Sequence, residues 1–176
     1  ATLETYQMAP DKFAMKVNMM GMTVQEQKYD GTKGLNAQMG QKKVITEGEE
    51  LEEMKAQAKM FEQLMYADAG YKLEIKGIEN VEGANCYKVI VTTPKVDVTT
   101  EFYDIKTNLL TRSVKTAGEG EKMATITNDF KDYKAVEGVL VPHAITISGA
   151  MPVPMVLEAT TIEINKTVAA DVFKVE

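Results

Sequence analysis

The stretch EELEEMKAQAKMFEQLMYA, residues 49–67, has a helical periodicity that no other part of the chain repeats. Its apolar residues recur at spacings of three and four, which places them in one stripe along a single helix face. The stripe consists of Leu51, Met54, Ala58, Phe61 and Met65. We therefore predict one long helix over residues 49–67 that buries this stripe against the rest of the fold.

Both ends of this segment carry helix signals. Thr46 is expected to cap the first turn, and Gly70 is expected to end the helix. Four glutamates crowd the first turns, where negative charge complements the positive end of the helix dipole. We attribute this cluster, Glu49, Glu50, Glu52 and Glu53, to helix electrostatics in preference to a metal site.

The sequence before this helix alternates with the period of a β-strand. Phe13, Met15, Val17 and Met19 are separated by residues that are mostly polar, so one face of this strand is apolar. A tight bend is expected at Met20-Gly21, and further short strands are expected before Ile45. The apolar face is predicted to point inward, toward the helix.

The chain after residue 70 is strand-like throughout, with turn residues at the spacing of a meander. We expect strands around 71–75, 87–91, 96–103, 109–116, 123–133, 139–148 and 153–166, and turns at 82–83, 104–108, 118–120 and 137–138. Helices do not alternate with strands, which argues against a parallel α/β sheet. The predicted fold is mainly β (α+β): one strongly curved antiparallel sheet, a half-barrel of about ten strands, wrapped around one long helix. No linker or repeat divides residues 1–176, so we expect a single domain.

Composition excludes several classes of function. The 176 residues carry 20 Lys and Arg against 26 Asp and Glu, a net charge of −6, which argues against nucleic acid as a partner. Only one cysteine and one histidine occur, so a zinc site of cysteines and histidines cannot form within one chain. Nine of the 12 methionines fall within the first 65 residues. Flexible methionine side chains suit core packing, and they also suit a surface that accepts varied apolar ligands.

Motifs of catalysis are missing from the sequence. It has no phosphate-binding glycine loop, nucleophile elbow, metalloprotease motif or C-x-x-C pair. His143 and Cys86 are interpreted as structural residues, because nothing adjacent marks either as activated. Asp129 and Asp132, with Glu137 beyond, are interpreted as a solvated strand edge in preference to a pair of catalytic acids. We expect no enzyme activity and no cofactor.

Three segments in order are similar to a known family. They are Asn80–Val89, Glu101–Leu110 and Asp129–Pro142, which contain NVEG, EFYD-x-x-TNLL and DFKDY-x-x-VEGVLVP. This order resembles the outer-membrane lipoprotein-sorting (LolA-like) proteins over about residues 71–166. It is also similar to the region that follows the peptidase repeats in some bacterial M16 (insulinase-like) zinc proteases. The resemblance implies a curved antiparallel half-barrel that covers a helix, with an apolar concavity for acyl chains.

The chain departs from these families at its beginning. The sorting proteins open with an amphipathic helix, whereas this chain is strand-like by Phe13, and Leu3 to Met8 is itself read as a strand. An acceptor lipoprotein would carry a cysteine at its mature N-terminus, where this chain has Ala1. A periplasmic or otherwise extracytoplasmic location is expected, with a signal peptide removed or trimmed. The uncharged stretch 138–157 is not expected to span a membrane, because prolines interrupt it.

Three functional hypotheses remain. The leading one is a noncatalytic binding domain with an apolar cavity for the acyl chains of a lipid or lipoprotein. The second is a structural accessory domain of an envelope protein, such as an M16-type protease, whose cavity is filled by its own methionines. An enzyme that works with carboxylates alone is the third. The predicted ligand-binding residues are Phe13, Met15, Val17, Met19, Leu51, Met54, Phe61 and Met65.

Overall fold

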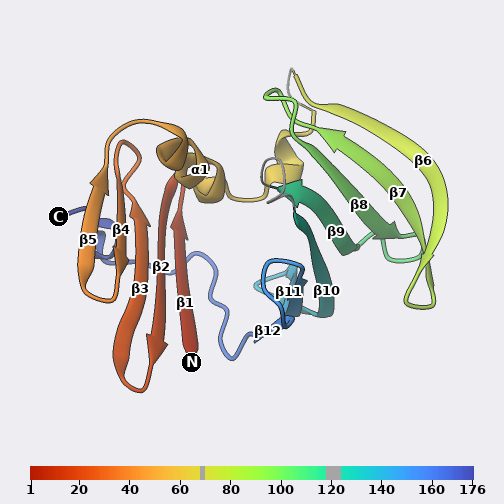
Figure 1. Cartoon of the computed structure of the whole chain (residues 1–176). Helices are drawn as coiled ribbons and strands as arrows, with labels where there is room; N and C mark the ends of the chain where they lie inside the picture. Colours follow the sequence, from red (N-terminus) through yellow and green to blue (C-terminus); the bar gives the residue numbers. More distant parts are fainter. Residues whose placement is uncertain (68–69, 118–123) are drawn as a thin grey trace. The chain divides into compact units, whose positions relative to one another are not determined.

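The computed structural model describes residues 1–67, 70–117 and 124–176, so the turn predicted at 118–120 lies outside the described residues. Two compact units make up the chain. The first comprises Ala1–Leu64 together with Lys166–Glu176, and the second comprises Met65–Asn165. Each unit is built on one antiparallel sheet (Figure 1).

The first sheet is a meander of five strands in chain order. Its strands are β1 (Thr2–Met8), β2 (Lys12–Met19), β3 (Met22–Tyr29), β4 (Gly34–Gln38) and β5 (Gln41–Ile45). Met20 and Gly21 form the predicted bend between β2 and β3, and both have positive φ angles of 50° and 80°. A two-residue hairpin turn needs this left-handed backbone, which explains a glycine in the turn.

Helix α1 (Glu49–Ala58) lies on one face of this sheet, at the end where β2 begins (Figure 1). Leu51, Met54 and Ala58 are buried against a row of facing side chains that includes Phe13, Tyr29 and Ile45. Gly34 completes this row, and the Met54 sulfur fills the space that a Cβ at Gly34 would occupy. The predicted packing of the helix on the strand that contains Phe13 is therefore confirmed.

The predicted start of the helix at Glu49 is confirmed, but its predicted C-terminal end and its predicted cap and stop residues are wrong. Residue 59 is already extended, and Phe61 has a φ of 53°, so the helix ends at Ala58 although the apolar spacing continues to Met65. A short 3-10 helix, η1 (Glu62–Met65), follows. At the other end Gly48 is the N-cap residue, and no side chain caps the first turn, so neither Thr46 nor Gly70 has its predicted role.

The C-terminal segment covers the opposite face of the first sheet. It contains the 3-10 helix η3 (Ala170–Phe173), which contacts β2. Phe173 and Val175 are buried, as are Ala14 and Leu35 on the sheet face that points away from α1. The Lys42 ammonium donates to the Glu176 carbonyl oxygen at 3.2 Å. The first sheet thus carries a helix on one face and the C-terminal segment on the other.

The second sheet has seven antiparallel strands in the order β12-β11-β10-β9-β8-β7-β6. They are β6 (Lys72–Val81), β7 (Ala84–Thr92), β8 (Val98–Asp104), β9 (Leu110–Ala117), β10 (Ala124–Val136), β11 (Val139–Ser148) and β12 (Met155–Glu158). The mainly β, antiparallel prediction is confirmed. The prediction of one sheet is wrong, because β5 and β6 do not pair. A half-barrel wrapped around the helix is not confirmed, since neither sheet is closed or strongly curled.

Gly149 fixes the chain as it leaves β11. Its φ is 86°, and a Cβ there would overlap the Thr125 carbonyl oxygen of the neighbouring strand. Gly138, in the turn at the other end of β11, has a nearly equal φ of 85° but open space around it. An alanine at either position would therefore be strained by a similar left-handed φ, and the two positions differ in the steric overlap.

We expect Gly149→Ala to be clearly more destabilising than Gly138→Ala. The backbone strain alone costs about 1–2 kcal/mol in each variant, and the overlap adds at least about 1 kcal/mol to the loss in Gly149→Ala. Urea unfolding followed by circular dichroism measures both losses. Equal losses in the two variants would show that the β11 end is free to move away from β10.

Candidate functional site

An apolar strip leads out from under α1 along β2. It consists of Leu3, Met15, Val17 and Met19, and we call it the β2 strip. Leu3 pairs with Val17 across β1 and β2, so their side chains lie on the same sheet face as Phe13 and α1. Met15 packs against the buried core, Val17 is half-buried, and Met19 is 48% exposed. The strip is therefore a continuous apolar surface that begins in the core and ends in solvent.

The eight predicted ligand-binding residues divide into three groups. Phe13, Leu51 and Met54 belong to one cluster of buried side chains in the core of the first unit. The three residues Met15, Val17 and Met19 lie on the accessible part of the same face. Phe61 is 52% exposed in the segment after α1, and Met65 belongs to the second unit. The structure thus brings six of the eight residues to one face of the first sheet.

Polar side chains border the β2 strip on β3, β4 and β5. Gln27 pairs with Met15 and Asn36, and the row continues to Lys43. Glu50 at the start of α1 accepts hydrogen bonds from the Lys43 ammonium and the Asn36 amide, and these bonds lower the pKa of Glu50. A depression of about 440 Å³ lies in this border. It is lined by Asn36, Gln38, Met39, Gln41, Lys42 and Lys43. The helix-bearing face is therefore apolar at β2 and polar toward β5.

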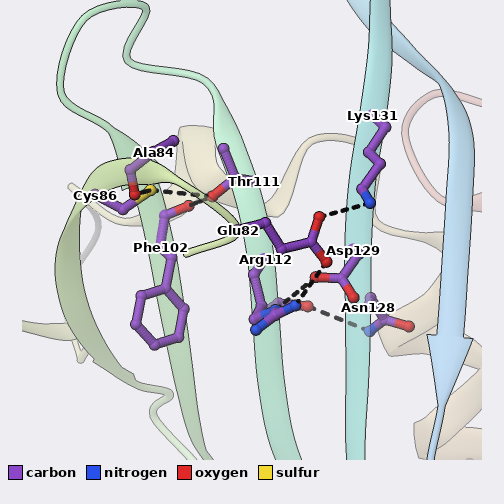
Figure 2. Close-up of polar contacts among 10 residues, drawn as sticks. Glu82, Ala84, Cys86, Phe102, Thr111, Arg112, Asn128, Asp129 and Lys131 are labelled. Atoms are coloured by element: carbon purple, nitrogen blue, oxygen red, sulfur yellow. Dashed lines mark hydrogen bonds and ion pairs between the residues drawn. The ribbon is translucent and has the colours of Figure 1, made fainter. Parts of the chain in front are cut away.

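The second unit holds a cluster of charges on β9 and β10, shown in Figure 2. The Arg112 guanidinium pairs with the buried Asp129 carboxylate and also reaches Glu82 at 3.2 Å. The Lys131 ammonium pairs with the same Glu82 at 2.6 Å. The hydrogen bond to Asp129 raises the pKa of Arg112, which stays charged. Asp129 is thus a buried ion-pair member, and the prediction of a solvated edge is wrong for it.

A second buried carboxylate, Glu101, was not singled out by the sequence. It accepts hydrogen bonds from the Tyr66 hydroxyl at 2.7 Å and from the Tyr103 hydroxyl at 2.6 Å. Burial, and then the bond to Glu101, raise the pKa of Tyr103, so this hydroxyl remains a donor. The arrangement satisfies the carboxylate and fastens the segment after η1 to the second sheet. One carboxylate oxygen accepts from each tyrosine hydroxyl, and we assign this cluster a structural role.

Cys86 and His143 occupy structural positions. Cys86 is buried beside Phe102, and its sulfur lies 3.4 Å from the Thr111 hydroxyl. His143 is half-buried, and its Nδ1 lies 3.0 Å from the Val141 carbonyl oxygen. The two residues are on different strands, Cys86 on β7 and His143 on β11. The residues that the structure describes include no group of acids, histidine and cysteine arranged to hold a metal ion.

No helix within the described parts of the chain is long and apolar enough to cross a membrane. Comparison of the sequence with protein-family models and with curated proteins gave no match.

Two solved structures share the fold. One is a LolA superfamily protein from Nitrosomonas europaea, with a TM-score of 0.65 and 10% identity. The match covers 98% of this chain and 80% of that chain. The other is a DUF1329 family protein from Desulfovibrio piger, with a TM-score of 0.67, 11% identity and the same coverage. Neither supports the alternative resemblance to M16-associated regions. The chain therefore has a LolA-like fold.

Proposed function

We propose that this chain is a noncatalytic, extracytoplasmic binding domain whose β2 strip receives the acyl chains of a lipid or lipoprotein. The observation that carries the proposal is the strip itself, an apolar surface that continues from the buried core to an exposed methionine within a LolA-like fold. We further propose that residues 1–176 act together as one LolA-like domain in the periplasm. The near-complete coverage of the chain by both similar structures supports this domain assignment.

The chemistry of the strip suits an acyl chain. A hydrocarbon tail makes no hydrogen bonds, so its affinity comes from buried apolar area at about 25 cal/mol per Å². Met15 and Met19 are unbranched and can adapt to tails of different length, whereas Val17 is stiff at χ1. Leu51 and Met54 belong to the core cluster that borders the buried end of the strip on the same sheet face. Gln27 and Asn36, the polar residues in register with Met15, would face the more polar end of such a ligand.

A second candidate function is a structural accessory domain without a ligand. The burial of Leu51, Met54 and Ala58 against Phe13 favours it, because the helix stripe is already filled by the protein's own side chains. In that case the exposed end of the β2 strip would be covered by a partner protein of the envelope. The two functions differ in whether the isolated chain binds an acyl chain.

Titration with an environment-sensitive fluorescent fatty acid distinguishes them. The proposal expects saturable binding to the wild-type chain, with competition by unlabelled fatty acids of several lengths, because the methionines adapt to each. Absence of saturable binding would favour the accessory domain. A matched short-chain carboxylate should not compete, since it buries too little apolar area.

A further inference from the structure

The loop between β11 and β12, together with the first two residues of β12, exposes an unusual run of apolar residues. Met151, Pro152, Val153, Pro154, Met155 and Val156 follow one another, and all six are exposed. Met151 is 53%, Val153 72% and Val156 60% exposed. A run of this length on a protein surface is unfavourable in water and usually marks a contact site. None of these residues belongs to the β2 strip or to its unit.

The loop is held firmly at both ends. Ile147 pairs with Met155 where β11 and β12 meet, and Ala144 pairs with Glu158 further along the ladder. At its first residue, Gly149 lies tightly against the Thr125 carbonyl oxygen. The exposed run is therefore presented from a fixed base on the second sheet.

The composition of the loop fits a lipid environment better than a protein surface. No Asp, Glu, Lys or Arg occurs between Gly138 and Leu157. Pro152 and Pro154 have no backbone N–H, so two of the donors that would need a partner in a lipid phase are absent. The apolar side chains between and beside the prolines offer only hydrophobic contact. Aromatic and arginine side chains, which are enriched at protein interfaces together with methionine, are absent from residues 151–156.

We infer that residues 151–156 form a membrane-contact loop, which places its apolar side chains in the interfacial layer of a lipid bilayer. The loop carries no positive charge and the chain has a net charge of −6, so anionic lipid does not strengthen the contact. Binding is therefore expected to be as strong on zwitterionic phosphatidylcholine vesicles as on vesicles with anionic lipid. This contact is independent of acyl binding at the β2 strip.

Flotation of the wild-type chain with phosphatidylcholine vesicles tests the inference, with Val153→Asp as the variant. Removing one inserted valine side chain alone predicts about a tenfold lower partition coefficient. Val96→Asp is the matched control, because Val96 is 75% exposed in a turn of the same sheet but is flanked by Lys95 and Asp97. The control is expected to float like the wild type.

Three results would overturn the inference: a wild-type chain that does not float, equal flotation of Val153→Asp and wild type, or binding that requires anionic lipid. Met151→Asp provides a second variant at the same loop and is expected to behave like Val153→Asp. Both loop variants should still bind the fluorescent fatty acid in the absence of vesicles. Loss of fatty-acid binding in both would place the loop in the ligand site instead of at the membrane. The fatty-acid titration and the flotation assay are independent measurements, so either the membrane inference or the acyl-binding proposal can fail without the other.

Discussion

Phe173→Ala is expected to lower the free energy of unfolding by about 3–5 kcal/mol. Phe173 is 1% exposed, and its segment packs on β2 from the side opposite α1. Truncation to alanine removes most of a buried ring and leaves a cavity over Ala14 and Leu35, which are themselves buried on that face. The loss should appear in urea unfolding followed by far-UV circular dichroism.

Phe61→Ala is the matched control for this result. Phe61 was predicted from its spacing to pack on the sheet, but it is 52% exposed beyond the end of α1. Its removal is expected to cost about 1 kcal/mol or less. A large loss at Phe61 together with a small loss at Phe173 would contradict the description of the first unit, in which the C-terminal segment and not the extended helix completes the core.

The double substitution Met15→Lys with Met19→Lys is expected to abolish saturable binding of the fluorescent fatty acid. Each change places an ammonium on the β2 strip, and an acyl chain that binds there would have to desolvate it. Both positions are at least partly accessible, and the lysine stems can extend to solvent, so the fold is expected to persist. Met54→Lys is unsuitable, because Met54 is 3% exposed and its replacement would disrupt the core.

Met20→Lys with Met39→Lys makes the same change in composition and charge elsewhere on the same sheet. Both of these methionines lie in hairpin turns and are strongly exposed. The control is expected to bind the probe like the wild type, with unchanged circular dichroism in both double variants. If the Met15→Lys with Met19→Lys variant is less stable than the wild type, Met19→Lys alone, at the more exposed position, replaces it in the binding assay. Equal binding by the strip and turn variants would exclude the β2 strip as the acyl site.

Local patterns in the sequence predict β2 and the buried face of α1, but they do not predict where the helix ends. The alternation of Phe13, Met15 and Val17 correctly predicts β2, and the 3.6-residue period correctly places Leu51 and Met54 on the buried helix face. The same period continues through Phe61 and Met65, where the backbone has already left the helix. No proline or glycine marks this end, so the change of direction at Phe61 depends on tertiary contacts that periodicity does not contain.

Long-range pairing explains the remaining differences. The strands before and after α1 would show the same alternation of apolar and polar residues in one sheet or in two. The chain forms two sheets because β5 and β6 do not pair. Asp129 has an ordinary strand position, and its burial follows from the register that sets it opposite Arg112. Phe173 ends the one-turn 3-10 helix η3 and Val175 follows it, and so short a segment has no periodicity from which to predict contacts with residues far away in sequence.

Native mass spectrometry of the wild-type chain as purified tests the acyl-binding account most directly. The account predicts a fraction of the protein with bound lipid or fatty acid, in a series of adduct masses that differ in acyl-chain length, because Met15 and Met19 accept chains of several lengths. The Met15→Lys with Met19→Lys variant should lack this series, whereas the Met20→Lys with Met39→Lys control should keep it. A wild-type spectrum with only the ligand-free mass, under conditions in which added fatty acid also fails to bind, would contradict the account.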